Sequence, residues 1–204
     1  MSEKKIQQDI TLVGGGIMSL TLAVLINEVN PKLKIHLIER LPGCGKESSD
    51  ALNNAGTGHA GYCELNYTPQ NEDGQVTIKR AIEINEMFEV SLQFWAYLDK
   101  KYSKFNPKNF IKKTPHISFV WGEKNVKFLK KRYLELRKQP LFEGIEFTEN
   151  SKTIKDWAPL LIEGRTRTEK IAATRVSHGT DVDFGELTSQ LLIILLKNKN
   201  FTLI

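Results

Sequence analysis

The segment that most constrains the fold is a glycine-rich turn, GGGIMS at 14–19, which lies between an apolar run and a helical pattern. Residues 9–13 (DITLV) predict a buried strand, residues 16–28 a helix and residues 34–38 (KIHLI) a second strand. One apolar face of that helix is expected to carry Met18, Leu22, Leu25 and Ile26. A strand, a helix and a strand at this spacing predict a right-handed βαβ unit.

The turn itself indicates a dinucleotide site. Gly14 permits the tight turn, and Gly16 lets the backbone approach a pyrophosphate at the helix N-terminus. Ser19 replaces the usual Gly or Ala at the third position, where a small residue packs against the strand. Glu39 follows the second strand and is expected to accept hydrogen bonds from the ribose hydroxyls, which argues against NADP. The alternative is a purely structural strand–turn–helix. The predicted cofactor site also includes Gly15 and Arg40.

A loop over 40–74 follows, and its central part reads ESSDALNNAGTGHAGYCEL at 47–65. It has neither helical nor strand periodicity and is too long for an ordinary connection. Small residues let a backbone lie against a flavin ring, and amide and hydroxyl groups can hydrogen-bond that ring. The sequence therefore favours a flavin-contacting loop over a plain surface loop. The residues expected to contact the cofactor are Ser48, Ser49, Asn53, Asn54, Ala55, Gly56, Thr57 and Gly58.

The rest of the chain alternates helical and strand patterns. A long amphipathic helix is expected at 76–99, and Asp183 is expected to cap a final helix at 184–197. NFTLI at 200–204 is expected to begin a further strand, so we expect the chain to be the front part of a longer protein. Between these helices we expect a strand at 116–122, a helix at 123–138, a strand at 144–147 and a helix at 151–157.

Composition indicates an ordinary globular protein, with 40% apolar and 26% charged residues. The N-terminus has no apolar core of the signal-peptide kind, and the run LLIILL at 191–196 is too short to span a bilayer. We therefore expect an intracellular protein without a membrane-spanning helix. Cys44 and Cys63 form no C-x-x-C pair and are expected to be packing residues or incidental thiols, and we predict no metal site.

Positive charge is concentrated in residues 100–138, which hold 13 Lys and Arg but only 2 Asp and Glu. One interpretation is a solvated helix face with its loop. A second is attraction to an anionic membrane surface. Nucleic acid ranks last, because no motif would place a helix or strand in a groove, and we predict no nucleic-acid partner.

Six segments together resemble one known family. They are VGGGIMS, ESSDALNNAGTGHAGYCELNYTP, AIEINEMFEVSLQFWAYL, PHISFVWGEKNVKFLKKRY, WAPLL and AATRVSHGTDVDFGELT, and they run along nearly the whole chain. They closely resemble the FAD-dependent malate:quinone oxidoreductases of bacteria. The resemblance implies FAD as cofactor, oxidation of L-malate to oxaloacetate in the tricarboxylic acid cycle, and electron transfer to membrane quinone. It also implies a cytoplasmic protein attached peripherally to the inner membrane, which would give residues 100–138 a purpose.

The resemblance also implies a fold class. We expect an α/β protein with a Rossmann-like FAD-binding domain, of the D-amino-acid-oxidase two-domain type, and part of an α+β substrate domain. Residues 1–75 are expected to begin the FAD-binding domain, 76–180 to form a partial substrate domain, and 181–204 to return to the first domain. Because members of the family are longer, we expect this chain to be an N-terminal portion.

The implied chemistry is hydride transfer from malate to the flavin, with a base that takes the hydroxyl proton. Histidine is the commonest such base. His59, in the glycine-rich loop, is the preferred candidate; His116 follows, whereas His36 and His178 are expected to be structural. Arg175 is the candidate for a substrate carboxylate because guanidinium suits bidentate binding, and its alternative role is a surface or interdomain ion pair.

Two other functions are kept open. One is an FAD-dependent dehydrogenase of another 2-hydroxy acid, since nothing in these residues selects the acid. The other is a non-catalytic remnant that binds nucleotide weakly. An exposed sheet edge and an unfilled core are expected to make the isolated chain marginally stable and prone to aggregation.

Overall fold

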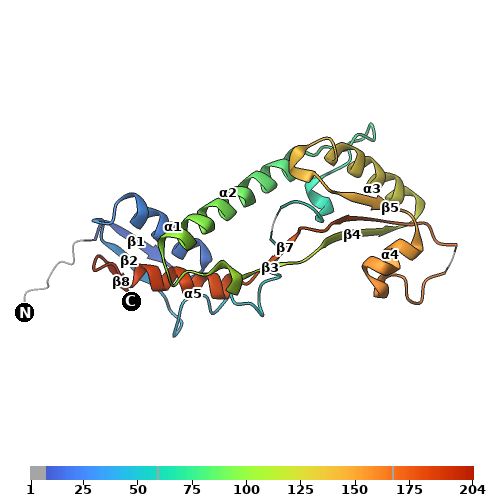
Figure 1. Cartoon of the computed structure of the whole chain (residues 1–204). Helices are drawn as coiled ribbons and strands as arrows, with labels where there is room; N and C mark the ends of the chain where they lie inside the picture. The colour runs from blue at the N-terminus through green and yellow to red at the C-terminus, as the bar shows by residue number, and fades with distance from the viewer. Residues whose placement is uncertain (1–7, 59, 167) are drawn as a thin grey trace, which may run out of the picture. The chain divides into compact units, whose positions relative to one another are not determined.

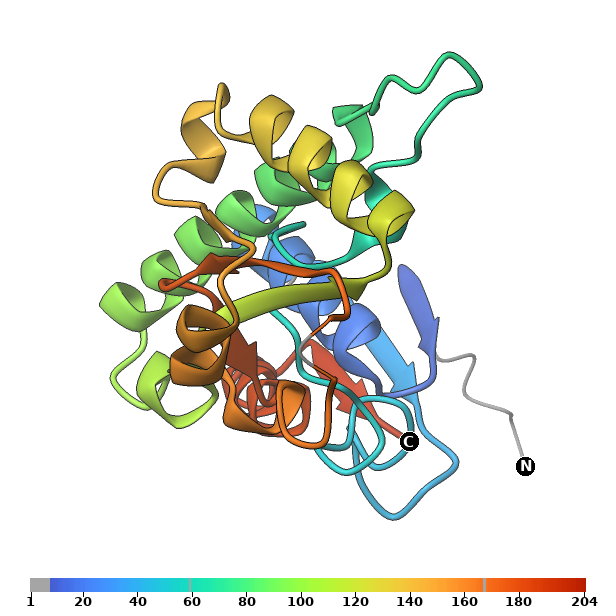
Figure 2. The same cartoon turned by 90° about the vertical axis from the view of Figure 1, so that its right-hand side faces the viewer.

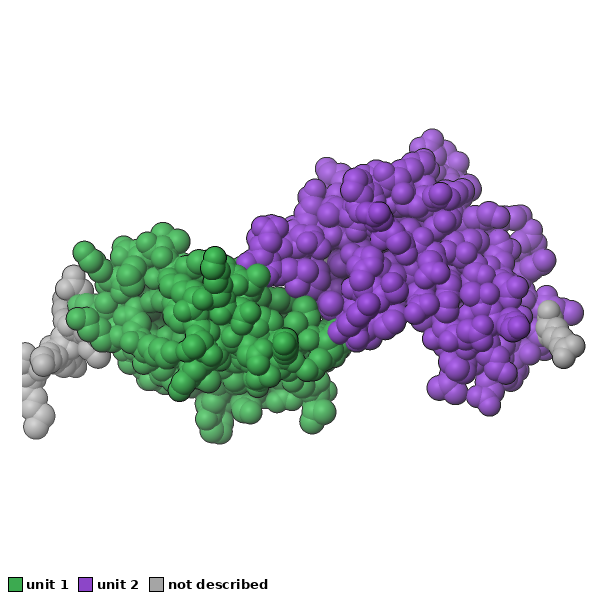
Figure 3. Space-filling view, in the orientation of Figure 1, with its two compact units in different colours: residues 1–57, 94–112, 181–204 green, residues 58–93, 113–180 purple. Residues whose placement is uncertain are grey.

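The structure is a computed structural model of the whole chain, and it describes residues 8–58, 60–166 and 168–204. The chain divides into two compact units, which Figure 3 shows in different colours. Both units are discontinuous in sequence. Unit 1 comprises residues 1–57, 94–112 and 181–204, and unit 2 comprises residues 58–93 and 113–180.

Unit 1 contains a parallel sheet with the strand order β1-β2-β8. Leu12 of the first strand lies opposite Leu37, which in turn lies opposite Leu203. The predicted βαβ unit is confirmed, and the residues after the last helix do form a strand that joins it (Figures 1 and 2). The elements are β1 (Ile10–Val13), α1 (Ile17–Val29), β2 (Ile35–Ile38), α5 (Phe184–Leu195) and β8 (Phe201–Leu203).

Helix α1 packs against α5, and its buried side is not the one expected from the sequence. Met18, Leu22 and Leu25, which were expected to form its apolar face, are exposed. The helix is apolar on two sides, so periodicity alone cannot decide which side faces the core. The buried side of α1 consists of Leu20, Ala23 and Val24.

Helix α2 (Lys79–Lys101) contributes to both units, so the compact units divide the chain differently from the predicted domains. Residues 94–112, expected in the substrate domain, belong to unit 1, because the apolar pattern of the long helix continues without a break at residue 93. Residues 58–75, expected in the FAD-binding domain, belong to unit 2, where Ala60 and Tyr62 join a buried apolar cluster. The return to unit 1 at residue 181 coincides with the predicted boundary.

Unit 2 contains an antiparallel sheet with the strand order β4-β6-β5. Helix α3 covers one face, where Val126 and Leu129 pack with Val120 and Ala172, and α4 lies on the other face (Figure 1). The elements are β4 (His116–Trp121), α3 (Glu123–Leu136), β5 (Glu146–Thr148), α4 (Ser151–Trp157) and β6 (Ile171–Val176).

Short elements connect these layers. Strand β3 (Ile111–Lys113) pairs with β7 (Thr180–Val182). Asp183 caps α5 as predicted, because its Oδ1 accepts the Glu186 N–H at 2.8 Å. Four 3₁₀ turns are described: η1 (Leu65–Tyr67), η2 (Pro107–Asn109), η3 (Pro140–Phe142) and η4 (Pro159–Leu161).

The basic segment 100–138 is exposed at its lysines, but it includes one buried cation. Arg132 on α3 is fully buried, so it is not part of any charged surface. Several of the lysines pair locally, as Lys127 does with Glu123 at 2.6 Å. Within residues 8–58, 60–166 and 168–204, no helix is long and apolar enough to cross a membrane.

Candidate functional site

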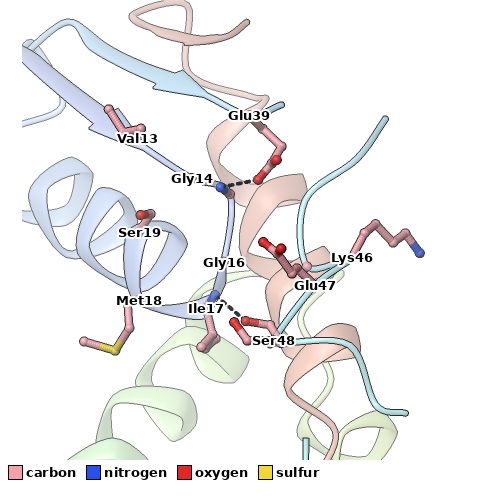
Figure 4. Close-up of a pocket in the computed structure, with 13 residues that line it drawn as sticks. Val13, Gly14, Gly16, Ile17, Met18, Ser19, Glu39, Lys46, Glu47 and Ser48 are labelled. Atoms are coloured by element: carbon pink, nitrogen blue, oxygen red, sulfur yellow. Dashed lines mark hydrogen bonds between the residues drawn. The ribbon is translucent and has the colours of Figure 1, made fainter. Parts of the chain in front are cut away.

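The glycine turn and the first part of the long loop line one cavity in unit 1 (Figure 4). Its volume is about 280 Å³. This is slightly below the roughly 300–1,000 Å³ of typical ligand sites, so the cavity accommodates part of a dinucleotide. Gly14, Gly15, Gly16, Ser19, Glu39, Ser48 and Ser49, all predicted cofactor residues, lie in its wall together with Val13, Ile17, Met18, Gly45, Lys46 and Glu47.

The turn is shaped by residues that lack a side chain. Gly14 has a φ of +91°, and a Cβ there would meet open space rather than protein. A Cβ on Gly15 would lie 2.6 Å from the Cys44 sulfur, so this position cannot take a side chain without a shift. The Gly15 carbonyl also accepts the Gly45 N–H at 2.9 Å. The turn and the loop are therefore held together by backbone contacts.

The N-terminus of α1 opens into this cavity. Gly16 is the N-cap residue and has no side chain that could cap the helix. The buried hydroxyl of Ser49 accepts the Ile17 N–H at 2.9 Å instead. Met18 and Ser19 complete the first turn and line the cavity. A helix N-terminus with accessible amides favours an anion, and the residues present fit a pyrophosphate.

Glu39 stands beside the turn directly after β2. Its Oε1 accepts the Leu41 N–H at 2.8 Å, and its Oε2 accepts the Gly15 N–H at 2.5 Å. These two backbone donors hold the pKa of the Glu39 carboxyl below its usual value. Each carboxylate oxygen has a second lone pair, so Glu39 can also accept hydrogen bonds from a hydroxyl in the cavity.

The remaining predicted loop residues contact the loop itself or strand β7. Asn54 donates to the Ser48 carbonyl at 3.1 Å and accepts the Gly56 N–H at 2.9 Å. Gly56 accepts the Val182 N–H at 2.5 Å, and Thr57 forms a β-bridge with Asp181.

Arg40 and Gly58 complete the predicted set. Arg40 forms an ion pair with Glu47 at 3.1 Å, with both side chains largely exposed. In unit 2 Gly58 donates to the Thr180 carbonyl at 2.8 Å. A Cβ on Gly58 would lie 2.0 Å from the Thr180 hydroxyl. This close approach requires glycine at position 58 whether or not a cofactor binds there. A role of either residue in cofactor binding stays a prediction.

The predicted catalytic residues lie in different settings. His59 lies outside the described residues. Arg175, in β6, has its guanidinium 5.5 Å from the Trp157 ring centre and 4.0 Å from the Glu146 carboxylate. Its Nε is buried and has no hydrogen-bond partner among the described residues. These contacts match the ion-pair alternative for Arg175, and a role on substrate stays a prediction.

A histidine and tyrosine cluster in unit 2 was not anticipated from the sequence. The Tyr62 hydroxyl lies 3.2 Å from His178 Nε2, and the Tyr62 ring packs edge-on against His116 and Phe142. His116 Nε2 lies 3.0 Å from the Thr180 carbonyl. Burial raises the pKa of the Tyr62 hydroxyl. His116 and His178 therefore share one tyrosine, which the separate positions in the sequence do not indicate.

Arg132 is a second residue whose role was not predicted, because it lies among lysines in the sequence. Its Nη2 donates to the carbonyls of Gly61 and Tyr62 at 3.2 and 2.9 Å, and its Nε donates to the Thr68 hydroxyl at 2.9 Å. Burial lowers the pKa of Arg132 to about 10, which leaves the guanidinium charged at neutral pH. Arg132 therefore fixes the backbone that follows the glycine-rich loop.

The two cysteines are free thiols. Burial, followed by the negative charge of Glu39, raises the pKa of Cys44, and burial raises the pKa of Cys63 to about 12. Both thiols are therefore protonated at neutral pH. Among the described residues, no group of three or more His, Cys, Asp or Glu side chains could hold a metal ion.

Solved structures define the class of fold. The chain is similar to glycine oxidase from Geobacillus kaustophilus, with a TM-score of 0.63, 14% identity, and coverage of 96% of this chain and 46% of that one. It is also similar to an L-alpha-glycerophosphate oxidase from Mycoplasma pneumoniae with FAD bound. That TM-score is 0.55 at 17% identity, covering 97% of this chain and 44% of the other. The chain therefore has the α/β fold of a part of these oxidases, as predicted.

Sequence comparison identifies the family within that class. The family model for malate:quinone oxidoreductase matches residues 6–204. The probable malate:quinone oxidoreductase of Tolumonas auensis is 55% identical over 200 residues, which are 98% of this chain and 40% of that relative. The chain belongs to the malate:quinone oxidoreductase family, and the predicted resemblance is confirmed. It spans about 40% of the length of the curated relatives it matches.

Proposed function

We propose that the cavity between the glycine turn and residues 45–49 binds the phosphate and ribose part of FAD. The observation that carries this proposal is that the open N-terminus of α1, the Glu39 carboxylate and the loop after β2 line one cavity. Likeness to an oxidase described as having FAD bound supports the choice of a flavin dinucleotide. When bound, FAD supplies the acceptor for a hydride from a substrate carbon.

The residues of this chain would divide the binding task. Gly14 and Gly16 leave room for a pyrophosphate near the backbone, and the first turn of α1 supplies N–H groups and a favourable dipole. Glu39 would accept hydrogen bonds from ribose hydroxyls through its remaining lone pairs. Ser49 already binds the Ile17 N–H, so it would stay as a cap or donate its own proton to a phosphate oxygen.

We further propose that the chain serves the activity named for its family, oxidation of L-malate with transfer of electrons to quinone. The oxaloacetate formed would belong to the tricarboxylic acid cycle. The names of the relatives support the substrate and the acceptor. The exposed lysines of residues 100–138 support peripheral attachment to the cytoplasmic face of the inner membrane, where anionic lipids attract basic segments.

A visible absorption spectrum tests these proposals. The chain is purified with FAD present, freed of unbound cofactor, and measured before and after anaerobic addition of L-malate. A retained flavin band supports the site, and bleaching by L-malate supports the activity. Bleaching by a different 2-hydroxy acid but not by L-malate would favour the alternative substrate. Absence of a flavin band would refute cofactor binding by this chain and favour the non-catalytic alternative.

A matched pair of variants assigns the band to the cavity. Glu39→Gln keeps the size of the side chain but removes its negative charge. The carboxylate oxygens that carry this charge accept the Gly15 and Leu41 N–H groups and would accept hydrogen bonds from the ribose hydroxyls. Loss of this charged acceptor is expected to weaken FAD binding about tenfold or more. Glu163→Gln, at an exposed carboxylate in unit 2, is the control and is expected to bind FAD as the parent does.

A further inference from the structure

The long loop is held by side chains at residues 60–63. The Ala60 carbonyl accepts the Asn85 side-chain N–H at 2.8 Å, and the Cys63 carbonyl accepts the Ser118 hydroxyl at 2.8 Å. The two carbonyls between them accept N–H bonds from Arg132 Nη2 at 3.2 and 2.9 Å. All of these residues lie in unit 2, and the donors belong to α2, β4 and α3. Residues 60–63 therefore form a clamped segment, whose four carbonyls are fixed from three elements.

The clamped segment is largely buried, although it belongs to no helix or strand. Buried carbonyls without helix or sheet partners need other donors, which a surface loop would take from water. Here the donors are buried side chains, and Arg132 is fully buried. A buried guanidinium is costly to desolvate, so its use at this place indicates that the position of the segment matters.

The loop is also held near its beginning. In unit 1 the Gly45 N–H is bonded to the Gly15 carbonyl, and the Ser49 hydroxyl accepts the Ile17 N–H. Between the held parts, residues 51–55 are exposed. A loop of small and polar residues that is exposed but held on both sides is pre-organised for a ligand, because little conformational freedom is left to lose on binding.

Gly58, the last predicted cofactor contact of the loop, is linked directly to the clamped segment. Its carbonyl accepts the Ala60 N–H at 2.7 Å, and its N–H donates to the Thr180 carbonyl at 2.8 Å. A shift of residues 60–63 would therefore be passed to Gly58 and to the loop before it.

We infer that Asn85, Ser118 and Arg132 are positioning residues for the flavin ring of FAD. By holding residues 60–63 they fix the end of the predicted flavin-contacting part of the loop, residues 53–58, so that its backbone meets the ring in one arrangement. The inference rests on the proposed function, because the ligand is the same FAD. It goes further by assigning a task to three residues that do not line the cavity.

Comparison of ADP with FAD tests the inference. ADP carries the phosphates and ribose of FAD but no flavin ring, so it requires the cavity and not the loop. Ser118→Ala removes the donor to the Cys63 carbonyl, and Arg132→Lys removes the planar fork that reaches two carbonyls. In calorimetric titrations of the full chain, each variant is expected to weaken FAD binding about fivefold or more and to leave ADP binding unchanged. The visible band of the bound flavin should shift as well.

Three further variants separate positioning from general stability. Ser118→Thr keeps a hydroxyl and should restore FAD binding. Thr174→Val removes a buried hydroxyl at the position paired with Ser118, where it has no hydrogen-bond partner among the described residues. Leu129→Ala weakens the core of unit 2 without removing a donor of the clamped segment. Both of these controls are expected to bind FAD as the parent does.

Several outcomes would overturn the inference. These are equal effects of Ser118→Ala and Thr174→Val, loss of FAD binding in Leu129→Ala to the same extent, or equal loss of ADP and FAD binding. A thermal melt shows which variants fold, and Ser118→Ala with its controls decides the question if Arg132→Lys does not.

The parent chain distinguishes this inference from the proposed function. A parent that binds neither ADP nor FAD would refute the cofactor cavity and the clamp's role with it. A parent that binds ADP but not FAD would leave the cavity and overturn the inference, and so would clamp variants that bind FAD as a binding-competent parent does.

Hydrogen exchange tests the clamp without any cofactor. The Gly58 and Ala60 amides are expected to exchange about fivefold faster in Ser118→Ala than in Thr174→Val, because only the first variant frees the clamped segment. Equal exchange in the two variants would overturn the inference.

Discussion

The two sheets of this protein differ in how well they are covered. In unit 2 the antiparallel sheet has α3 on one face and α4 on the other, and the outer side of α3 carries charged residues such as Lys127 and Lys130. In unit 1 the parallel sheet has α1 and α5, yet α1 carries an exposed apolar stripe that includes Met18, Leu22 and Leu25, and β1 has one open edge in the described residues. The comparison teaches that α3 turns charged residues to solvent, whereas α1 turns a stripe of apolar residues to solvent.

The largest expected effect is on unit 2. Arg132→Met removes the donors of two buried carbonyls and of the Thr68 hydroxyl, so it should destabilise unit 2 by about 4 kcal/mol. Hydrogen exchange of the β4 and β6 amides measures this change. Lys131→Met, at the exposed neighbouring residue, is the control. A loss below about 1 kcal/mol would mean that unit 2 is less tightly built than its contacts indicate.

Matched leucine truncations test the comparison itself. Leu129 in unit 2 and Leu20 in unit 1 are both 0% exposed. Truncation of a buried leucine to alanine costs about 2–5 kcal/mol, and the cost falls where the surroundings can collapse into the space. We therefore expect Leu129→Ala to destabilise unit 2 by about 3 kcal/mol and Leu20→Ala to destabilise unit 1 by about 2 kcal/mol, measured by local hydrogen exchange. The reverse order would contradict the proposed difference.

A carboxylate in unit 1 gives a smaller effect. Glu28 accepts hydrogen bonds from the hydroxyls of Tyr97 and Tyr102. Its Oε2 also forms an ion pair with Lys101 Nζ at 2.5 Å. Burial opposes the charge, but the hydrogen bonds from Lys101 and the two tyrosines outweigh it and lower the pKa of Glu28. Glu28→Gln should destabilise unit 1 by about 1.5 kcal/mol at pH 7, as judged by denaturant unfolding.

The pH dependence of Glu28 has a definite sign. Because the folded-state pKa lies below the ordinary value of 4.5, this stabilisation is present above pH 4.5 and is lost as the pH falls through the lowered pKa. The stability difference between parent and Glu28→Gln should therefore shrink as the pH is lowered below 4.5. A difference that persists unchanged at pH 2 would rule out the carboxylate charge as its cause.

The smallest effect is expected at the protein surface. Lys127 and Glu123 pair at 2.6 Å, but their side chains are 70% and 71% exposed. Exposed pairs contribute about 0–1 kcal/mol because solvent screens them. Lys127→Ala should change the stability of unit 2 by less than about 0.5 kcal/mol in a denaturant titration. A larger loss would show that the basic face of α3 supports unit 2 as well as covering it.

Local structure could be predicted well from this sequence. The βαβ unit, the Asp183 cap and α4 at 151–157 followed from short-range patterns, and the structure contains all three. The cavity could be predicted less completely. The glycines and Glu39 could be placed because the turn and the end of the second strand are adjacent in a βαβ unit. The hydrogen bond between Ser49 and Ile17 depends on the path by which the loop returns to the turn.

Three features could not be predicted, each for a physical reason. Helix α1 is apolar on two sides, so its buried face is decided by α5, which lies far away in sequence. Arg132 lies among exposed lysines, and only the carbonyls of Gly61 and Tyr62 give it a reason to be buried. Two of the four junctions between the units follow residues 57 and 93, where neither composition nor periodicity changes.

The pairing of β2 with β8 also has a consequence for synthesis on the ribosome. Ile35 lies opposite Phe201, so one side of β2 has no partner until residues 201–203 have been made. At about 5–20 residues per second, this interval lasts roughly 10–30 s. During that time unit 1 cannot close its sheet, and an unpaired strand edge is available to chaperones or to a neighbouring nascent chain.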